Sequence, residues 1–154
     1  MTTGQTQTEK KAIPIVRHLH LPEKEGEEPY LEGSRCRNCG ETYVDRRRVC
    51  VKCYARDMEK VALGKTGELF TFTIVHQSAP GVPVPYVAAV VRLSEGPFVT
   101  ANLVDVEPKP ENLRAGMKLE MVVRKVREDR AGNDIIAYQY RPVEKKDSTQ
   151  RIGR

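Results

Sequence analysis

Four cysteines in two closely spaced pairs constrain this chain more than any other feature of its sequence. The pairs are Cys36-Arg-Asn-Cys39 and Cys50-Val-Lys-Cys53, with ten residues between them. Two residues between the cysteines of a pair allow a tight knuckle that directs both sulfurs to one point, and two knuckles complete a tetrahedral zinc site with no open position. Gly40, directly after the first pair, suits a knuckle that needs a positive φ. The spacing predicts one structural zinc ion (Zn²⁺) held by four thiolates.

Paired cysteines also occur in disulfides, redox-active sites and iron–sulfur centres. Disulfides are disfavoured because the N-terminal sequence lacks the apolar core of a secretory signal, and the reducing cytosol keeps thiols free. A thioredoxin-like pair would lie in a βαβ pattern, which does not surround these cysteines. Structural zinc is the preferred interpretation, and such sites contribute on the order of 10–16 kcal/mol of binding energy to folding.

The composition describes a protein of about one domain. The chain has 154 residues, of which 39% are hydrophobic, and no stretch approaches the ~20 consecutive apolar residues of a membrane-spanning helix. The formal charge of +5 is a mild excess with acidic residues mixed among the basic ones, which is weak support for nucleic-acid binding. We expect a cytoplasmic protein that does not contact the membrane and for which nucleic acid is a disfavoured partner.

After Gly64, five short segments alternate with turn signals in the manner of a small all-β domain. Phe70, Phe72 and Ile74 are spaced to share one face of the first segment, and the second segment, YVAAVVRL, is apolar enough for a central strand buried on both faces. Five strands in about 75 residues fit a five-stranded Greek-key barrel of the OB type. The expected strands are residues 68–76, 86–93, 98–104, 117–126 and 135–140.

The predicted fold class is mainly β, with an N-terminal arm, a rubredoxin-like zinc ribbon and a five-stranded OB-fold barrel. Pro14, Pro22 and Gly26 interrupt the arm, so we expect an extended segment rather than a stable helix there. One strand and a loop are expected between the two knuckles. The predicted boundaries are a flexible or extended arm over 1–30, the zinc ribbon over 31–60, the barrel over 61–143 and a disordered tail over 144–154.

Catalytic machinery is not recognisable once zinc occupies the four cysteines. An enzyme of this size needs a nucleophile, a base or an open metal site. His18 and His20 lie in the arm with no acidic partner at a fixed spacing, and His76 follows a strand, where we expect a capped histidine at the strand edge. The sequence also contains no nucleophile elbow, no His-Glu-x-x-His and no phosphate loop. We therefore predict no catalytic residue in this chain acting alone.

Two features suit binding. The run Arg46-Arg47-Arg48 lies between the knuckles, and guanidinium groups have the fork of donors that suits a phosphate; a solvated basic loop is the alternative. Residues 79–86, APGVPVPY, form an apolar, proline-stiffened segment that would lose little entropy on docking; packing across an open end of the barrel is the alternative. The candidate contact residues are Arg46, Arg47, Arg48, Pro85 and Tyr86.

The order of these parts resembles the zinc-ribbon and OB-fold proteins of acyl-CoA metabolism, which are small subunits that accompany thiolases and related enzymes. The family carries a helical segment before the ribbon, whereas this chain has the proline-broken arm. The resemblance covers residues 35–143 and is carried by the two cysteine knuckles, by LGKTG (63–67) leading into FTFT (70–73), and by PYV (85–87), SEG (94–96) and LRAGM (113–117).

The resemblance implies a non-catalytic, zinc-binding accessory subunit in a hetero-oligomeric, thiolase-type complex. The thiolase-fold partner would carry the catalytic groups that cleave a 3-oxoacyl-CoA, with a bulky or aromatic acyl chain as one candidate substrate. This chain would shape the active site or hold the CoA thioester through the contact residues above. Subunits of aldolase or 3-hydroxy-3-methylglutaryl-CoA synthase complexes are sister possibilities, and an OB module that binds single-stranded nucleic acid is the alternative from another class.

Overall fold

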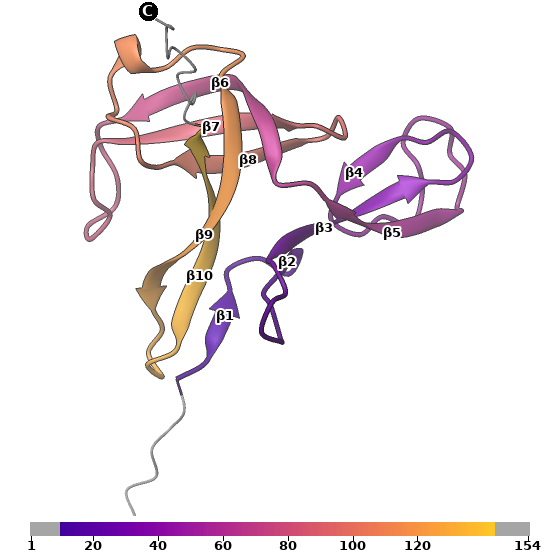
Figure 1. The fold of residues 1–154 in the computed structure, drawn as a ribbon, viewed down its shortest axis with the longest axis horizontal. Coiled ribbons are helices and arrows are strands. Elements are labelled where there is room, and N and C mark those ends of the chain that lie inside the picture. The colour runs from indigo at the N-terminus through magenta and orange to yellow at the C-terminus, as the bar shows by residue number, and fades with distance from the viewer. Residues whose placement is uncertain (1–9, 144–154) are drawn as a thin grey trace, which may run out of the picture.

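The computed structural model of the chain describes residues 10–143, and its regular structure is almost entirely β-strand (Figure 1). The tail predicted for residues 144–154 lies outside the described residues. No helix of bilayer-spanning length and hydropathy occurs in the described part of the chain. The elements are β1 Ala12–Pro14, β2 Leu19–His20, β3 Tyr30–Cys36, β4 Thr42–Val44, β5 Met58–Leu63, β6 Thr66–Val75, β7 Tyr86–Leu93, β8 Phe98–Leu103, the 3₁₀ helix η1 Pro110–Asn112, β9 Lys118–Glu128 and β10 Asp134–Pro142.

Five strands form the predicted OB-type barrel, which confirms the fold class. Their order is β10-β8-β7-β6-β9, and the pairing of β9 with β10 closes the ring. No strand end differs from the predicted segments by more than two residues. The barrel interior is filled by alternate residues of the strands, such as Leu69, Val87, Val91 and Leu119.

Two predictions about strand faces are wrong. In β7 every second residue, from Val87 to Leu93, is buried and the residues between them are partly or fully exposed, because only one side of a barrel wall faces the core. In β6 a β-bulge lies between Leu69 and Thr71. The extra residue shifts the alternation, so Phe70 lies on the outer surface with 58% of its area exposed, apart from the core-facing Phe72.

The ribbon sheet is built around β3. Strand β5 pairs with one edge of β3, and β2 and β4 share the other edge. The strand expected between the knuckles is β4. Gly33 in β3 allows this close packing, since a Cβ atom there would lie 2.6 Å from the Tyr43 carbonyl oxygen and 2.9 Å from the Leu63 side chain.

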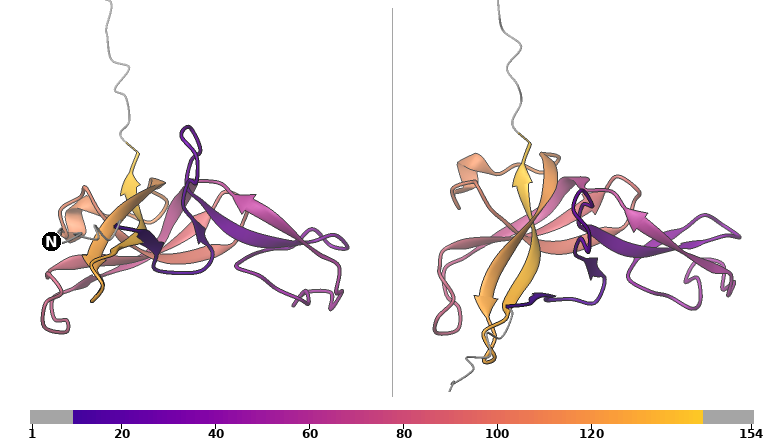
Figure 2. Two further views of the ribbon diagram at one scale, coloured as in Figure 1. Left: turned by 90° about the horizontal axis from the view of Figure 1, so that it is seen from below. Right: turned by 60° about the horizontal axis from the view of Figure 1, so that its bottom comes forward.

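Residues 1–9 of the predicted arm lie outside the described residues, and the described part, residues 10–30, is extended and connects the ribbon to the barrel. Strand β1 pairs in parallel with the start of β10, and β2 joins the ribbon sheet. Figures 1 and 2 show the arm beside the long β9–β10 hairpin, which extends past the rest of the barrel. Leu19 from the arm and Leu31 and Leu63 from the ribbon belong to the same buried cluster as the barrel interior. Arm, ribbon base and barrel therefore share one core.

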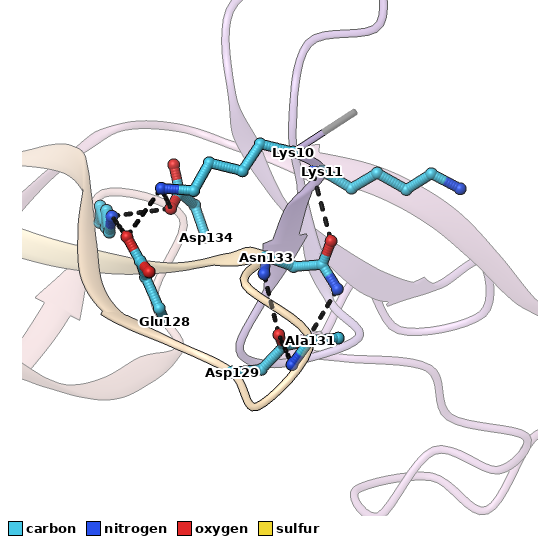
Figure 3. A network of polar contacts seen from close by, with 8 residues as sticks. Lys10, Lys11, Glu128, Asp129, Ala131, Asn133 and Asp134 are labelled. Atoms are coloured by element: carbon cyan, nitrogen blue, oxygen red, sulfur yellow. Dashed lines mark hydrogen bonds and ion pairs between the residues drawn. The ribbon is translucent and has the colours of Figure 1, made fainter. Parts of the chain in front are cut away.

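Ion pairs attach the start of the arm to the tip of this hairpin (Figure 3). Lys10 Nζ lies 2.7 Å from Glu128 and 3.5 Å from Asp134. Lys125 Nζ lies 2.5 Å from Glu128 and 2.7 Å from Asp134. The hydrogen bonds from Lys10 and Lys125 lower the pKa of Glu128 to about 2. Two lysines from distant parts of the chain thus neutralise two carboxylates at one place.

Candidate metal centre and basic cavity

The four cysteine sulfurs converge at the end of the ribbon away from the barrel core. They all lie within 4.8 Å of one another, with 3.6 Å between Cys36 and Cys53 and 3.5 Å between Cys39 and Cys50. Sulfurs at ~2.3 Å around a tetrahedral zinc ion are about 3.8 Å apart. The size of the cluster and its donor set therefore fit one structural zinc ion with no open position.

The two knuckles repeat one backbone pattern. The Gly40 N–H donates to the Cys36 carbonyl at 2.8 Å, and the Tyr54 N–H donates to the Cys50 carbonyl at 3.0 Å. Gly40 has a φ of 77° and Tyr54 a φ of 60°. The left-handed region costs a non-glycine residue roughly 1–2 kcal/mol. Strain at Tyr54 was not foreseeable from residue type, although its position after the second pair matches that of Gly40.

Two polar side chains support the sulfurs. The Tyr43 hydroxyl lies 3.4 Å from Cys50 Sγ and accepts a hydrogen bond from the Val51 N–H at 3.2 Å. The Asn38 amide donates to Cys53 Sγ at 3.4 Å. The Tyr43 contact lowers the pKa of the Cys50 thiol to about 6, and the Asn38 contact lowers that of Cys53. Zinc binds thiolates, so both contacts favour metal binding.

The arginine run borders a cavity of ≈ 630 Å³ on the ribbon. The buried carboxylate of Glu32 binds the arginine loop, residues 46–48, to the ribbon sheet. It lies 2.5 Å from Arg46 Nε and 3.1 Å from Lys60 Nζ, and the Glu32 side chain is only 5% exposed. The Arg47 guanidinium stands over the Tyr43 ring, 4.7 Å from its centroid. The cavity is lined by Arg17, Ser34, Arg46, Arg47, Arg48, Met58, Glu59 and Lys60.

The charge balance of the cavity is positive. Burial raises the pKa of Glu32, but hydrogen bonds from Arg46 and Lys60 outweigh burial and lower it, so Glu32 stays ionised. Arg48 makes no hydrogen bond or ion pair with any residue in 10–143. Cations therefore outnumber carboxylates, and the cavity suits an anion. The cations are Arg17, Arg46, Arg47, Arg48 and Lys60, and the carboxylates in or beside the cavity are Glu32, Asp45 and Glu59.

His20 lies beside an acidic residue of another strand, although its Nε2 makes no hydrogen bond within the described residues. Its Nε2 lies 3.0 Å from Glu32, and its ring stacks on Tyr30 with centroids 4.8 Å apart. The spacing in the sequence does not reveal this pair because β2 must first align with β3. The contact joins the arm to the carboxylate beneath the arginine loop.

Pro85 and Tyr86, the other two predicted contact residues, do not line the basic cavity. They end the β6–β7 loop, which Figure 1 shows at the end of the barrel remote from the ribbon. Residues 76–85 are all exposed, so the alternative that this loop packs across the barrel is wrong. The structure therefore does not bring the arginine run and the proline loop into one site.

A closed four-cysteine centre on a ribbon, joined through a shared core to an OB-type barrel, defines a class of zinc-ribbon and OB-fold proteins. Residues 24–59 match the model of the ChsH2 rubredoxin-like zinc ribbon domain, and residues 60–124 match that of the ChsH2 C-terminal OB-fold domain. The chain belongs to the DUF35 family.

Three similar proteins each match more than two thirds of the chain. A DUF35 domain-containing scaffold protein of Pyrococcus furiosus is 39% identical over 76% of this chain and 86% of its own. The benzoylsuccinyl-CoA thiolase subunit BbsA of Thauera aromatica is 31% identical over 88% of this chain and 93% of its own. The solved Ltp2-ChsH2(DUF35) aldolase matches with a TM-score of 0.55 and 26% identity, over 73% of this chain and 84% of that one. The predicted family is confirmed, as is one structural zinc ion.

Proposed function

We propose that this chain is a non-catalytic accessory subunit of a thiolase-type complex that acts on 3-oxoacyl-CoA thioesters. The observation that carries the proposal is the closure of the metal centre, where all four cysteines of the chain surround one point. Zinc held in this way has no position for substrate, and no thiol is left to attack an acyl group. The chain then contributes shape and binding surface, and a thiolase-fold partner contributes the catalytic groups. The similarity to a thiolase subunit supports this choice of partner.

In this proposal the basic cavity contacts the phosphates of the CoA thioester. Guanidinium forks bind phosphate through paired, charge-assisted hydrogen bonds. Glu32 and Tyr43 hold Arg46 and Arg47 in place, so little side-chain entropy is lost when an anion binds. The exposed loop that ends in Pro85 and Tyr86 contacts the partner subunit.

The test begins with the tagged full-length chain, purified from its native cells together with any bound enzyme. The copurifying enzyme is identified by mass spectrometry, and CoA-dependent cleavage of a 3-oxoacyl-CoA is assayed for each chain and for the complex. We expect this chain alone to be inactive and the complex to be active. Cleavage by this chain unaided, or the absence of a CoA-dependent enzyme from the complex, would overturn the proposal.

The role of the cavity is tested in the same complex by Arg48→Ala. We expect KM for the acyl-CoA to rise about tenfold, the loss of one charge-assisted contact, with kcat little changed. Arg56→Ala is the matched control, because Arg56 is an exposed ribbon arginine that does not line the cavity. Equal effects of the two substitutions would show that the cavity does not bind CoA.

An aldolase complex is the second candidate, and the similarity to the Ltp2-ChsH2(DUF35) aldolase favours it. Retro-aldol cleavage of a CoA thioester by the purified complex, without free CoA, would select it; a 3-hydroxy-3-methylglutaryl-CoA synthase complex would instead form a carbon–carbon bond. Single-stranded nucleic acid has less support. The exposed aromatic pair Phe70 and Phe98 lies on strands without the basic groove that such binding uses.

A further inference from the structure

The barrel wall formed by β6, β7 and β8 is uncharged except at one end, where Glu68 of β6 lies opposite Arg92 of β7 and Arg92 lies opposite Phe98 of β8. Residues 69–91 contain no Asp, Glu, Lys or Arg, and neither does β8, although 31% of the whole chain is charged. The exposed apolar part of this surface is formed by Phe70 and Phe98, and contiguous exposed apolar surface marks interaction sites. Among the uncharged residues that alternate toward the outside of this wall, the small ones are Thr71, Thr73, Ala88, Val90 and Thr100. The larger ones are Phe70, Tyr86, Phe98 and Asn102.

One edge of this wall is β6, which pairs with β7 on one side and has its other side free over its second half. β6 pairs with β9 only at Thr66–Glu68, and Leu69 ends that contact by accepting from the Gly116 N–H and donating to the Met117 carbonyl. Beyond the bulge, β6 pairs with β7 alone among residues 10–143. The second half of β6 is therefore an edge.

The register shows which way the main chain of this edge points. The Leu93 N–H donates to the Pro97 carbonyl on the β8 side of β7. Because hydrogen-bond direction alternates along an antiparallel strand, Ala88 bonds in the opposite direction, toward β6. Its partner in β6 is Thr73, so Thr73 bonds to β7.

The residues on either side of Thr73 therefore point outward. The N–H and C=O groups of Phe72 and Ile74 face away from β7, and no other part of residues 10–143 hydrogen-bonds to them. Their side chains pack against the core. The edge thus offers two main-chain donors and two acceptors in the spacing that an added strand requires.

This edge lacks the protection that proteins give to unpaired strands, which is charge, proline or cover. The outer half of β9 pairs only with β10 and carries Arg124, Lys125 and Arg127. β6 carries no such residue after Glu68. Instead the bulge places Phe70 of this edge strand on the outer face of the wall, where its ring reaches over β7 and meets that of Phe98 in β8 edge-to-face with centroids 5.0 Å apart.

We propose that the free edge of β6 pairs with an extended, uncharged segment of the partner enzyme. The inference rests on the proposed function, because it names how the partner of that complex is held. Main-chain hydrogen bonds to Phe72 and Ile74 supply the pairing, and the Phe70–Phe98 pair receives an apolar side chain of the added strand, as in other cases of strand addition. The part of the wall beside Phe72 and Ile74 has no charge, so it selects a charge-free segment, since an unpaired charge would be desolvated there.

Amide hydrogen exchange with single-residue resolution tests the pairing. In the isolated chain the amides of Thr73 and Val75, bonded to β7, should exchange slowly, and those of Phe72 and Ile74 should exchange fast. In the purified complex the exchange of Phe72 and Ile74 should slow at least about tenfold. Unchanged exchange of both amides in a complex that does form would overturn this inference and leave the proposed function standing. Failure to form any complex would overturn both.

A pair of substitutions separates the edge from the wall. Thr73→Lys places a charge beside the edge, and Thr100→Lys places the same charge on the same wall but in β8; both side chains are exposed. We expect Thr73→Lys to weaken the complex at least tenfold and Thr100→Lys to change it less than twofold, with equal thermal midpoints. Equal weakening by both would mean face-to-face packing and would overturn strand pairing.

Two other occupants would also overturn the inference. The first is this chain's own residues 144–154, although six of these eleven residues are charged. In that case the amides of Phe72 and Ile74 would exchange slowly in the isolated chain and fast after truncation beyond Val143. Slow exchange that depends on protein concentration would assign the edge to a second copy of the chain.

Discussion

Tyr54 and Gly40 follow the two cysteine pairs at equivalent positions, and both have a positive φ. Only glycine adopts this conformation without strain. We expect Tyr54→Gly to raise the free energy of unfolding of the zinc-loaded protein by about 1 kcal/mol, measured by guanidinium unfolding. Tyr54→Ala is the control, because it removes the exposed ring and keeps the strained Cβ. A gain with Ala equal to that with Gly would contradict the explanation by backbone strain.

Cys39 is the zinc ligand whose side chain is exposed, so its substitution disturbs packing least. We expect Cys39→Ser to lower bound zinc well below one ion per chain and to unfold the knuckles, because the thiolate–metal bonds supply most of their folding energy, on the order of 10–16 kcal/mol for such sites. The measurement is metal analysis after dialysis against a weak chelator, with amide spectra of the ribbon. Val51→Ser, at an exposed neighbouring position, should keep its zinc.

At the residue scale, the sequence predicts contacts between residues close together in the chain. It does not predict contacts that depend on how two strands are aligned with each other. The cysteine ligands follow from spacing within two short segments. Glu32 and Lys60 meet only because β3 and β5 are antiparallel neighbours. Sequence spacing likewise does not predict that Glu32 of β3 contacts Arg46 in the loop after β4. The arginine run can be recognised in the sequence, but its contacts with Glu32 and Tyr43 cannot.

Among the elements, strand positions follow from alternation and turn residues, whereas strand faces do not always. Phe70, Phe72 and Ile74 have ideal spacing for one face, and a single bulged residue separates Phe70 from the other two. A bulge has no residue signature here, because Phe70 and Thr71 are both ordinary strand residues. The outward position of Phe70, on which the proposed strand pairing depends, was therefore accessible only from the structure.

The contact between β1 and the β9–β10 hairpin should depend on pH through Glu128. Its pKa in the folded chain, about 2, is below the ordinary value of 4.5. The stabilisation is therefore complete above about pH 4.5 and is lost as the pH falls toward 2. We expect amide signals of β1 to lose protection across this range. In Glu128→Gln they should be less protected at neutral pH and change less on acidification; identical profiles would contradict this role.

For the molecule as a whole, the shared core makes ribbon and barrel one cooperative unit. Leu31 in β3 is fully buried in that core. We expect Leu31→Ala to cost about 2–5 kcal/mol and to lower the thermal midpoint of the entire chain. Zinc release, followed with a metal-binding dye, and loss of β-structure, followed by circular dichroism, should coincide in wild type and variant. Two separate transitions would show that the ribbon unfolds independently.

The barrel itself could be predicted because five short strands with regular turns have few ways to remove their edges. The course of the arm could not. Its three-residue strand finds a parallel partner in β10 more than a hundred residues away, and so short a segment has no periodicity of its own. Only its breaks at Pro14 and Pro22 indicated that it would not be helical.

The pairing of β1 with β10 has a consequence for the order in which the chain folds during synthesis. The knuckles can acquire zinc as soon as Cys53 has left the ribosome, since their ligands are close in sequence. Ala12–Pro14 must wait for Asp134–Ile136, which are made more than a hundred residues later. A growing chain therefore exposes its four zinc ligands well before Ala12–Pro14 can find its partner strand, and the β9–β10 hairpin completes the pairing of β1.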